Sequence, residues 1–129
     1  MVKQTAGRDA LTGFADDFAR YNDDVLFGEV WNNPNISLHN RSMITISCLV
    51  GKGIVDDSLK YHITTAKKNG VTKEEMASML TQLGFYAGWP NAWAALKMAR
   101  EVYKDGGSHG GMFGLGSFNE AYKQYFIGN

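Results

Sequence analysis

Apolar positions recur along this chain at helical spacing, and no stretch shows the sustained two-residue alternation that is typical of a β-strand. The first set predicts a helix from Ala10 to Tyr21 and consists of Leu11, Phe14, Phe18 and Tyr21. A second helix is predicted from Asp23 to Trp31, because Asn32-Asn33-Pro34 follows it as a stop signal. The pattern as a whole predicts an all-α fold.

A third helix is predicted from Ser37, a good N-cap residue, to about Gly51. Its residues are apolar on nearly every face, as in Met43 to Val50. A helix with this pattern is expected to be buried on all sides rather than docked by one face. We therefore expect it to be the central helix.

A fourth helix is predicted to begin at Asp56 or Asp57 and to end at Asn69-Gly70, where glycine permits a left-handed ending. One face of this helix is apolar and consists of Leu59, Ile63 and Ala66. A fifth is predicted to begin with a capping box formed by Thr72 and Glu75. Apolar residues continue it to Tyr86; they are Met76, Met79, Leu80 and Leu83.

Gly88 is expected to break this helix, and Pro90 suits the first turn of a sixth. One side of the sixth helix carries small residues, which let another helix approach closely: Ala92, Ala95 and Ala99. The pattern leaves open whether that second helix comes from the same subunit or from a neighbouring one.

The C-terminal segment differs in composition from the rest of the chain. Residues 106–116 include six glycines, which resist regular structure. Four aromatic residues beyond them predict a short amphipathic helix that covers an apolar surface: Phe118, Tyr122, Tyr125 and Phe126. A neighbouring subunit is one candidate for that surface, and a frayed terminus is the alternative. Residues 106–129 are thus predicted to form a linker and a C-terminal arm.

Composition and charge narrow the possible functions. The 129 residues fit one domain spanning 1–129, and 13 basic residues balance 13 acidic ones. No basic block is longer than Lys67-Lys68, so we expect neither a nucleic acid nor an anionic membrane as a partner. The single cysteine, Cys48, excludes an internal disulfide and fits a reducing compartment.

No targeting signal is evident in the sequence. The segment 1–9 lacks the apolar centre of a signal peptide, and the run from Met43 to Val50 is too short to cross a bilayer. We therefore expect a soluble cytoplasmic protein.

Five segments in a fixed order carry a family resemblance. They are FGEVW (27–31), RSMITISCLV (41–50), His62, NGVTKEE (69–75) and FYAGWPNAW (85–93). In this order they resemble the carboxymuconolactone decarboxylase family over about residues 27–103. The resemblance implies a helical bundle of about six helices, similar to alkylhydroperoxidase D, that assembles as a homo-oligomer, a trimer or a hexamer.

The superfamily implied by this resemblance has a redox branch and a decarboxylase branch. Redox members carry Cys-x-x-Cys followed four residues later by a histidine. His62 corresponds to that histidine, but Val55 and Ser58 occupy the two cysteine positions, so a dithiol peroxidase mechanism is excluded. Cys48 acting alone is disfavoured, because we expect the thiol to be buried in an apolar run.

The decarboxylase branch implies a lyase that acts without a cofactor on a small carboxylated lactone or a related organic acid, within aromatic catabolism of the β-ketoadipate type. The lactone serves as its own electron sink, so the products are carbon dioxide and an enol-lactone. The reaction needs a cation for the second carboxylate, a donor to the developing enolate, an acid and an apolar wall. No metal is expected, because His39, His62 and His109 lie on separate segments without ligand spacing.

The resemblance implies His62 and Glu29 as the candidate catalytic residues, because the family has a functional histidine at the first position and a glutamate at the second. His62 follows Leu59 by three residues, so it borders the inward face of its helix, and imidazole titrates near neutral pH. The alternative is a core histidine. Glu29 lies within Phe27-Gly28-Glu29-Val30-Trp31, and a carboxyl group held among aromatic rings has a raised pKa and can act as an acid. An exposed residue or an ion-pair partner is the alternative for Glu29.

The candidate substrate-binding residues are one cation and five aromatic side chains. Arg41 precedes most of the third helix and can hold a carboxylate by two parallel hydrogen bonds, or else pair with an acid to lock two elements together. The apolar wall is assigned to Phe27, Trp31, Phe85, Tyr86 and Trp89. Core packing is the alternative for Tyr86 and Trp89, because aromatic residues at a helix joint are often core residues. Two other functions stay open, namely a peroxide-reducing protein that depends on Cys48 and a non-catalytic oligomer that binds a small organic acid.

Overall fold

The computed structural model describes residues 1–104. These residues form six α-helices and one π-helix and contain no strand, which confirms the all-α prediction. The predicted linker and aromatic arm at 106–129 lie outside the described residues. The chain divides into two compact units, residues 1–41 and the residues from 42 onward, and each unit is described by itself. The assignment of one domain to residues 1–129 stays a prediction.

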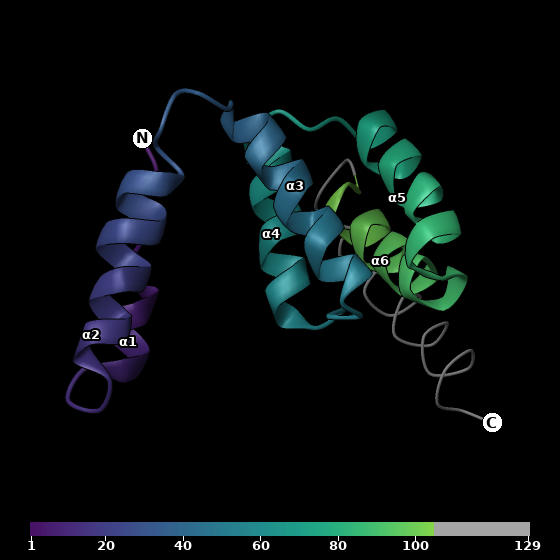
Figure 1. The fold of residues 1–129 in the computed structure, drawn as a ribbon. Coiled ribbons are helices and arrows are strands. Elements are labelled where there is room, and N and C mark those ends of the chain that lie inside the picture. The colour runs from purple at the N-terminus through teal and green to yellow at the C-terminus, as the bar shows by residue number, and fades with distance from the viewer. Residues whose placement is uncertain (105–129) are drawn as a thin grey trace. The chain divides into compact units, whose positions relative to one another are not determined.

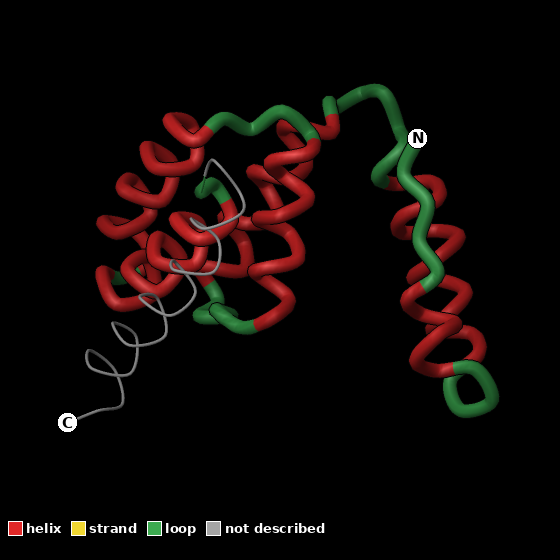
Figure 2. The backbone as a smooth tube through the Cα atoms, turned by 180° about the vertical axis from the view of Figure 1, so that it is seen from behind, coloured by secondary structure: helices red, strands yellow, loops and turns green. Residues whose placement is uncertain are grey.

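The N-terminal unit consists of three short helical segments, α1 (Ala6–Leu11), α2 (Asp16–Arg20) and η1 (Tyr21–Val30), and α1 packs against the other two. The predicted continuous helix from Ala10 to Tyr21 is wrong. The chain turns between α1 and α2, where Gly13 has φ +85° and its N–H donates to Asp16 Oδ1 at 2.6 Å. Figure 2 shows this turn as the loop that joins the two helices. The turn leaves Phe14 exposed.

The second predicted helix is present but differs in type. Residues Tyr21–Val30 form a π-helix that continues directly from α2. At its end the N–H of Trp31 donates to the carbonyl of Leu26 at 2.9 Å, a bond across five residues instead of four. Most π-helices are single-turn bulges inside α-helices, so ten residues are unusually long.

Asp23 holds the N-terminal unit together. Its buried carboxylate accepts hydrogen bonds from the backbone N–H groups of Gly7 at 2.8 Å and Arg8 at 3.0 Å, and from Asn22 Nδ2 at 2.9 Å. Burial acts to raise the pKa of Asp23, but these hydrogen bonds to the charged form outweigh it, so the pKa lies below its usual value. One carboxylate thus joins the start of α1 to η1.

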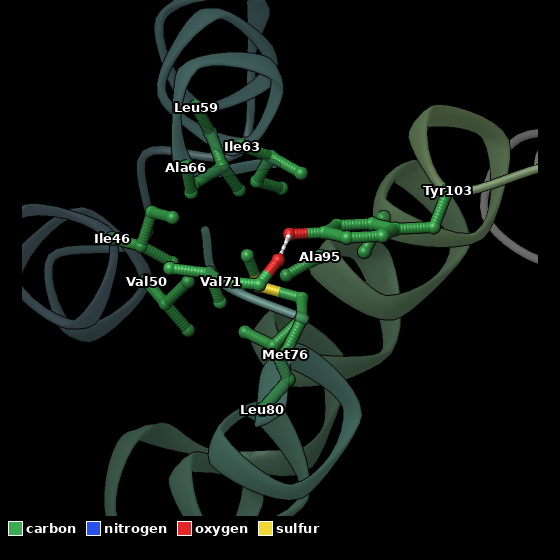
Figure 3. Packing of buried hydrophobic residues seen from close by; sticks show 11 residues of the cluster. Ile46, Val50, Leu59, Ile63, Ala66, Val71, Met76, Leu80, Ala95 and Tyr103 are labelled. Carbon is green, nitrogen blue, oxygen red and sulfur yellow. Dashed lines mark hydrogen bonds between the residues drawn. The ribbon is translucent and has the colours of Figure 1, made fainter. Parts of the chain in front are cut away.

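The C-terminal unit contains α3 (Leu38–Gly51) from Ser42 onward, α4 (Asp57–Lys68), α5 (Lys73–Ala87) and α6 (Trp89–Val102). α6 packs against both α4 and α5. Figure 3 shows the shared core, to which all four helices contribute. Its buried members are Ile46, Val50, Leu59, Ile63, Ala66, Val71, Met76, Leu80, Ala95, Ala99 and Tyr103. No helix among residues 1–104 combines the length and apolarity needed to cross a membrane.

The predicted helix ends of this unit are confirmed. Asp56 caps α4 by accepting from the N–H of Ser58 at 2.9 Å, and Gly70 ends the turn after α4 with φ +92°. Thr72 and Glu75 form both bonds of the capping box that begins α5. Gly88, with φ +99°, separates α5 from α6, and Pro90 lies in the first turn of α6.

The prediction that the third helix is buried on all sides is wrong. Only one stripe of α3 is buried, and it consists of Ser42, Ile46 and Val50 at intervals of four residues. Ile44, on another face, is 56% exposed. Four helices that share one core each turn a face outward, so an apolar residue on α3 need not be a core residue.

Tyr103 provides a test of the core. Its hydroxyl donates to the carbonyl of Val71 at 2.7 Å (Figure 3), and burial followed by the charge of Glu75 raises its pKa to about 12. Tyr103→Phe leaves that buried carbonyl without its donor, so we expect the free energy of unfolding to fall by about 1–3 kcal/mol. Urea unfolding measures this, with Tyr86→Phe, at an 83% exposed position, as the control. Equal losses in both variants would contradict the prediction.

Candidate active site

The eight predicted site residues belong to different units. Four lie in the N-terminal unit, and four lie in the C-terminal unit. The first group is Phe27, Glu29, Trp31 and Arg41; the second is His62, Phe85, Tyr86 and Trp89. The structure brings residues together within each group, and the two groups are described separately.

His62 lies on α4 at the border of its buried face. Its neighbours in the chain include Ile63, which is fully buried, while His62 itself is half-buried, as the spacing predicted. The imidazole ring contacts the Tyr61 ring edge to face, with 5.0 Å between centroids. Burial lowers the pKa of His62 below its usual value, because the charged imidazolium is less well solvated there. The ring is therefore mostly neutral at pH 7.

The lowered pKa of His62 has a consequence for stability. The unfolded chain binds this proton near pH 6.5, whereas the folded chain binds it only at lower pH, so stability falls as the pH drops through that window. We expect the urea midpoint to fall more between pH 7.5 and 5 for the native sequence than for His62→Gln. Parallel pH profiles for the two proteins would show that the folded and unfolded pKa values of His62 are equal.

The aromatic residues at the α5–α6 joint face solvent. Phe85 and Tyr86 are 79% and 83% exposed and Trp89 is 52% exposed, so they do not form a dry wall within this unit. The rings of Phe85 and Trp89 meet edge to face, with centroids 5.7 Å apart. Neither the predicted wall nor the alternative of core packing describes them, since they form an exposed aromatic patch.

Gly84 allows the Trp89 ring to approach α5 closely. A Cβ atom at residue 84 would come within 2.6 Å of the Trp89 ring, so Gly84→Ala is expected to displace that half-exposed ring. Alanine favours a helix over glycine by about 1 kcal/mol, which offsets the cost of the displacement. We therefore expect a shifted Trp89 indole resonance in an NMR spectrum and little change in stability. Gly51→Ala is the matched control, because a Cβ there meets nothing within 4 Å.

Phe27 and Trp31 form the buried aromatic pair of the N-terminal unit. Both rings are buried and stack, with 5.9 Å between centroids and 18° between planes. Glu29, two residues from each, is exposed on η1. The expectation that aromatic rings enclose Glu29 is therefore wrong within this unit, and the alternative of an exposed helix residue describes its position.

Arg41 has an unusual set of contacts. Its Nη2 donates to the carbonyl of Asn33 at 3.0 Å, and among residues 1–104 it forms no ion pair. Its Nε is buried and has no hydrogen-bond partner within the described chain. A buried N–H group without an acceptor is costly, and a carboxylate would satisfy it. The predicted structural pairing with an acid is absent from the described residues.

Cys48 lies on an exposed face of α3. The prediction of a buried thiol is wrong, for the same reason that the burial of the whole helix was wrong. The objection to single-cysteine redox chemistry that rested on burial no longer applies, but Val55 and Ser58 still stand where a cysteine pair would be. Within residues 1–104, no group of three or more His, Cys, Asp or Glu side chains is placed to hold a metal ion.

Sequence reasoning missed a pocket of about 500 Å³ between α5 and α6. None of the eight predicted site residues lines it. Its lining follows from helical spacing, since Lys73, Met76 and Ala77 share one face of α5, and Leu96, Ala99 and Arg100 share one face of α6. The shared faces could therefore be read from the sequence. They indicate a pocket only once the face of α5 and the face of α6 are known to lie against each other.

Comparison with known proteins supports the resemblance. The chain is 39% identical over 95 residues to the 4-carboxymuconolactone decarboxylase of Acinetobacter baylyi, covering 74% of this chain and 70% of that protein. It is 27% identical over 79 residues to the nitrosuccinic acid decarboxylase npaB of Metarhizium robertsii, covering 61% of this chain and 54% of that protein. Residues 16–101 match the family described as the carboxymuconolactone decarboxylase family. The chain therefore belongs to the carboxymuconolactone decarboxylase family.

Proposed function

We propose that this protein is a carboxy-lyase that needs no cofactor and converts a small carboxylated lactone, such as 4-carboxymuconolactone, to an enol-lactone and carbon dioxide. The observation that carries the proposal is the 39% identity to a protein named for this reaction, over 70% of that protein's length. The more distant relative is also named a decarboxylase, of a different acid. A role in aromatic catabolism follows from the substrate and is part of the proposal.

The chemistry sets what the protein must supply. The bond between the ring and the departing carboxylate breaks, and its electron pair passes through the conjugated double bond to the carbonyl oxygen of the lactone. A proton then reaches a ring carbon to give the enol-lactone. The protein has to hold the remaining carboxylate, stabilise the developing negative charge and deliver that proton.

We assign proton delivery to His62. Its half-buried ring and lowered pKa make the imidazolium a stronger acid than an exposed histidine, at the cost of a smaller protonated fraction at pH 7. The rate is therefore expected to fall as the pH rises above the folded-state pKa. Glu29 is the second candidate acid, although its exposure leaves it in an ordinary solvated position.

We assign the grip on the remaining carboxylate to Arg41. The support is the buried Nε that lacks an acceptor among the described residues, beside the Nη2 that is already fixed to Asn33. A guanidinium with one group fixed and another unsatisfied is oriented before the substrate arrives, so less rotamer freedom is lost on binding.

We also propose that the protein assembles as a homo-oligomer, a trimer or a hexamer. The support is the exposed aromatic patch of Phe85, Tyr86 and Trp89, since contiguous exposed apolar surface marks interaction sites. If a neighbouring subunit covers this patch, the three rings become buried and can form the apolar wall that they do not form within one subunit. Light scattering on the purified protein gives the molar mass that tests the assembly.

The decisive experiment measures carbon dioxide release from freshly prepared 4-carboxymuconolactone by the purified protein. Saturable release supports the proposal. No release from a folded protein would overturn this substrate, and saturable binding without turnover would favour the non-catalytic binder. Peroxide consumption that Cys48→Ser abolishes, together with no release of carbon dioxide, would favour the redox alternative, which the exposure of Cys48 keeps open.

A further inference from the structure

We propose that the pocket between α5 and α6 binds a small amphipathic anion, with its apolar body against the two helices and its carboxylate at the cationic rim. None of the residues assigned to decarboxylation is among the described residues that line it. The pocket has a volume of about 500 Å³, within the range of about 300–1,000 Å³ that is usual for small-molecule sites.

The inner surface of the pocket is apolar. Met76, Ala99 and Tyr103 are buried residues that line it, and Leu96 and Ala77 complete the apolar lining. Tyr103 is fixed at both ends, because its backbone N–H donates to the carbonyl of Ala99 at 2.9 Å and its hydroxyl donates to the carbonyl of Val71 at 2.7 Å. An aromatic ring held in this way gives the ligand a preformed surface.

Among the described lining residues, the rim of the pocket carries three cations, Lys73, Arg100 and Lys104, and no carboxylate. Lys104 Nζ lies 3.9 Å from Glu101 Oε1, so the carboxylate of Glu101 partly offsets the positive charge of Lys104. Lys73 and Arg100 form no ion pair within residues 1–104. An arginine without an ion pair among the described residues can hold a carboxylate by two parallel hydrogen bonds, which makes Arg100 the expected anchor.

A second hollow indicates which way the ligand lies. This hollow of about 400 Å³ shares Lys73 and Tyr103 with the pocket and is also lined by Lys67 and Glu74. Glu74 offsets part of the positive charge there, and Lys67 Nζ already donates to the carbonyl of Val102 at 3.1 Å. The excess of positive charge therefore lies at Arg100 and Lys73 on the rim of the first pocket, where the anionic group is expected.

Decanoate and decanol serve as probes, because they share an apolar chain and differ in charge. Isothermal titration with the whole protein is expected to show saturable binding of decanoate and weaker binding of decanol. Arg100→Gln is expected to weaken decanoate binding by about 10-fold or more, the loss typical of one charged hydrogen bond, and to leave decanol unchanged. Lys60→Gln removes one positive charge from an exposed position on α4 and is the matched control.

A second pair of variants tests the position of the site. Ala77→Phe fills the pocket and is expected to abolish binding of both probes, whereas Ser78→Phe adds the same ring at an exposed neighbouring residue outside the lining and is expected to have no effect. No saturable decanoate binding, equal affinity for the two probes, or equal effects of Ala77→Phe and Ser78→Phe would each overturn the proposal. These readouts measure binding and not turnover, so they are independent of the decarboxylase assay.

Discussion

His62→Gln is expected to lower kcat for carbon dioxide release by about 10²- to 10⁴-fold, the usual contribution of a positioned acid or base. The native enzyme should lose activity as the pH rises above the folded-state pKa of His62, which burial holds below its usual value. In the variant, the residual rate should no longer show that pH dependence. The comparison of kcat–pH profiles separates proton delivery from a merely structural role, which would lower the rate without changing the profile.

His39→Gln is the matched control for this experiment. His39 is also half-buried, on α3, and its Nδ1 lies 2.8 Å from Asn40 Oδ1. The same substitution there is expected to leave kcat within about 2-fold, because His39 is not among the residues assigned to the reaction and imidazole and amide side chains are of similar size. Turnover that survives His62→Gln would remove this residue as the acid and would direct the search to Glu29.

Ile46→Ala is expected to reduce the free energy of unfolding by about 2–5 kcal/mol. Ile46 is fully buried in the core shared by α3, α4, α5 and α6, and its removal leaves a cavity that the neighbouring side chains fill only in part. A loss of this size is a large fraction of the total stability of a small domain. Urea unfolding followed by circular dichroism measures it.

Ile44→Ala is the control on the same helix. Ile44 is 56% exposed, so the same truncation there is expected to cost less than about 1 kcal/mol. Two equal losses would contradict the one-sided burial of α3 and would restore the prediction of a helix buried on every face. If the protein assembles through this face, Ile44→Ala would instead lower the molar mass in solution.

Helix ends of the C-terminal unit were predictable because their causes are local. The capping box of Thr72 and Glu75 involves residues three apart, and Gly70 and Gly88 adopt positive φ values that other residues avoid. Such signals depend on neighbouring residues and not on distant ones. The same holds for the buried face of α4, which its own spacing determines.

The failed predictions have one local cause, the turn at Gly13, and otherwise non-local causes. Phe14 fits the apolar spacing of a helix, but a turn stabilised by the bond from Gly13 to Asp16 interrupts it. Apolar content gave no information on which face of α3 meets the core, so Ile44 and Cys48 were placed inside. A pattern of apolar residues identifies faces that can be buried, and the tertiary arrangement decides which of them are.

For the candidate site too, local spacing predicted some positions, whereas tertiary packing decided the others. The border position of His62 followed from its spacing to Leu59, whereas the exposure of Glu29 and of the aromatic patch did not follow from their apolar neighbours. The unsatisfied Nε of Arg41 was not predictable at all, because it depends on which acceptors lie within reach of the folded side chain.

The π-helix η1 affects how this chain should be aligned with its relatives. Bonds across five residues place one more residue in each turn than bonds across four would need. A relative with fewer residues between 21 and 30, about one fewer for each turn of η1, can therefore span the same segment as an ordinary α-helix, with its flanking residues in register. A short gap within this segment is then the expected mark of a changed helix type, and residues on its two sides should be matched independently.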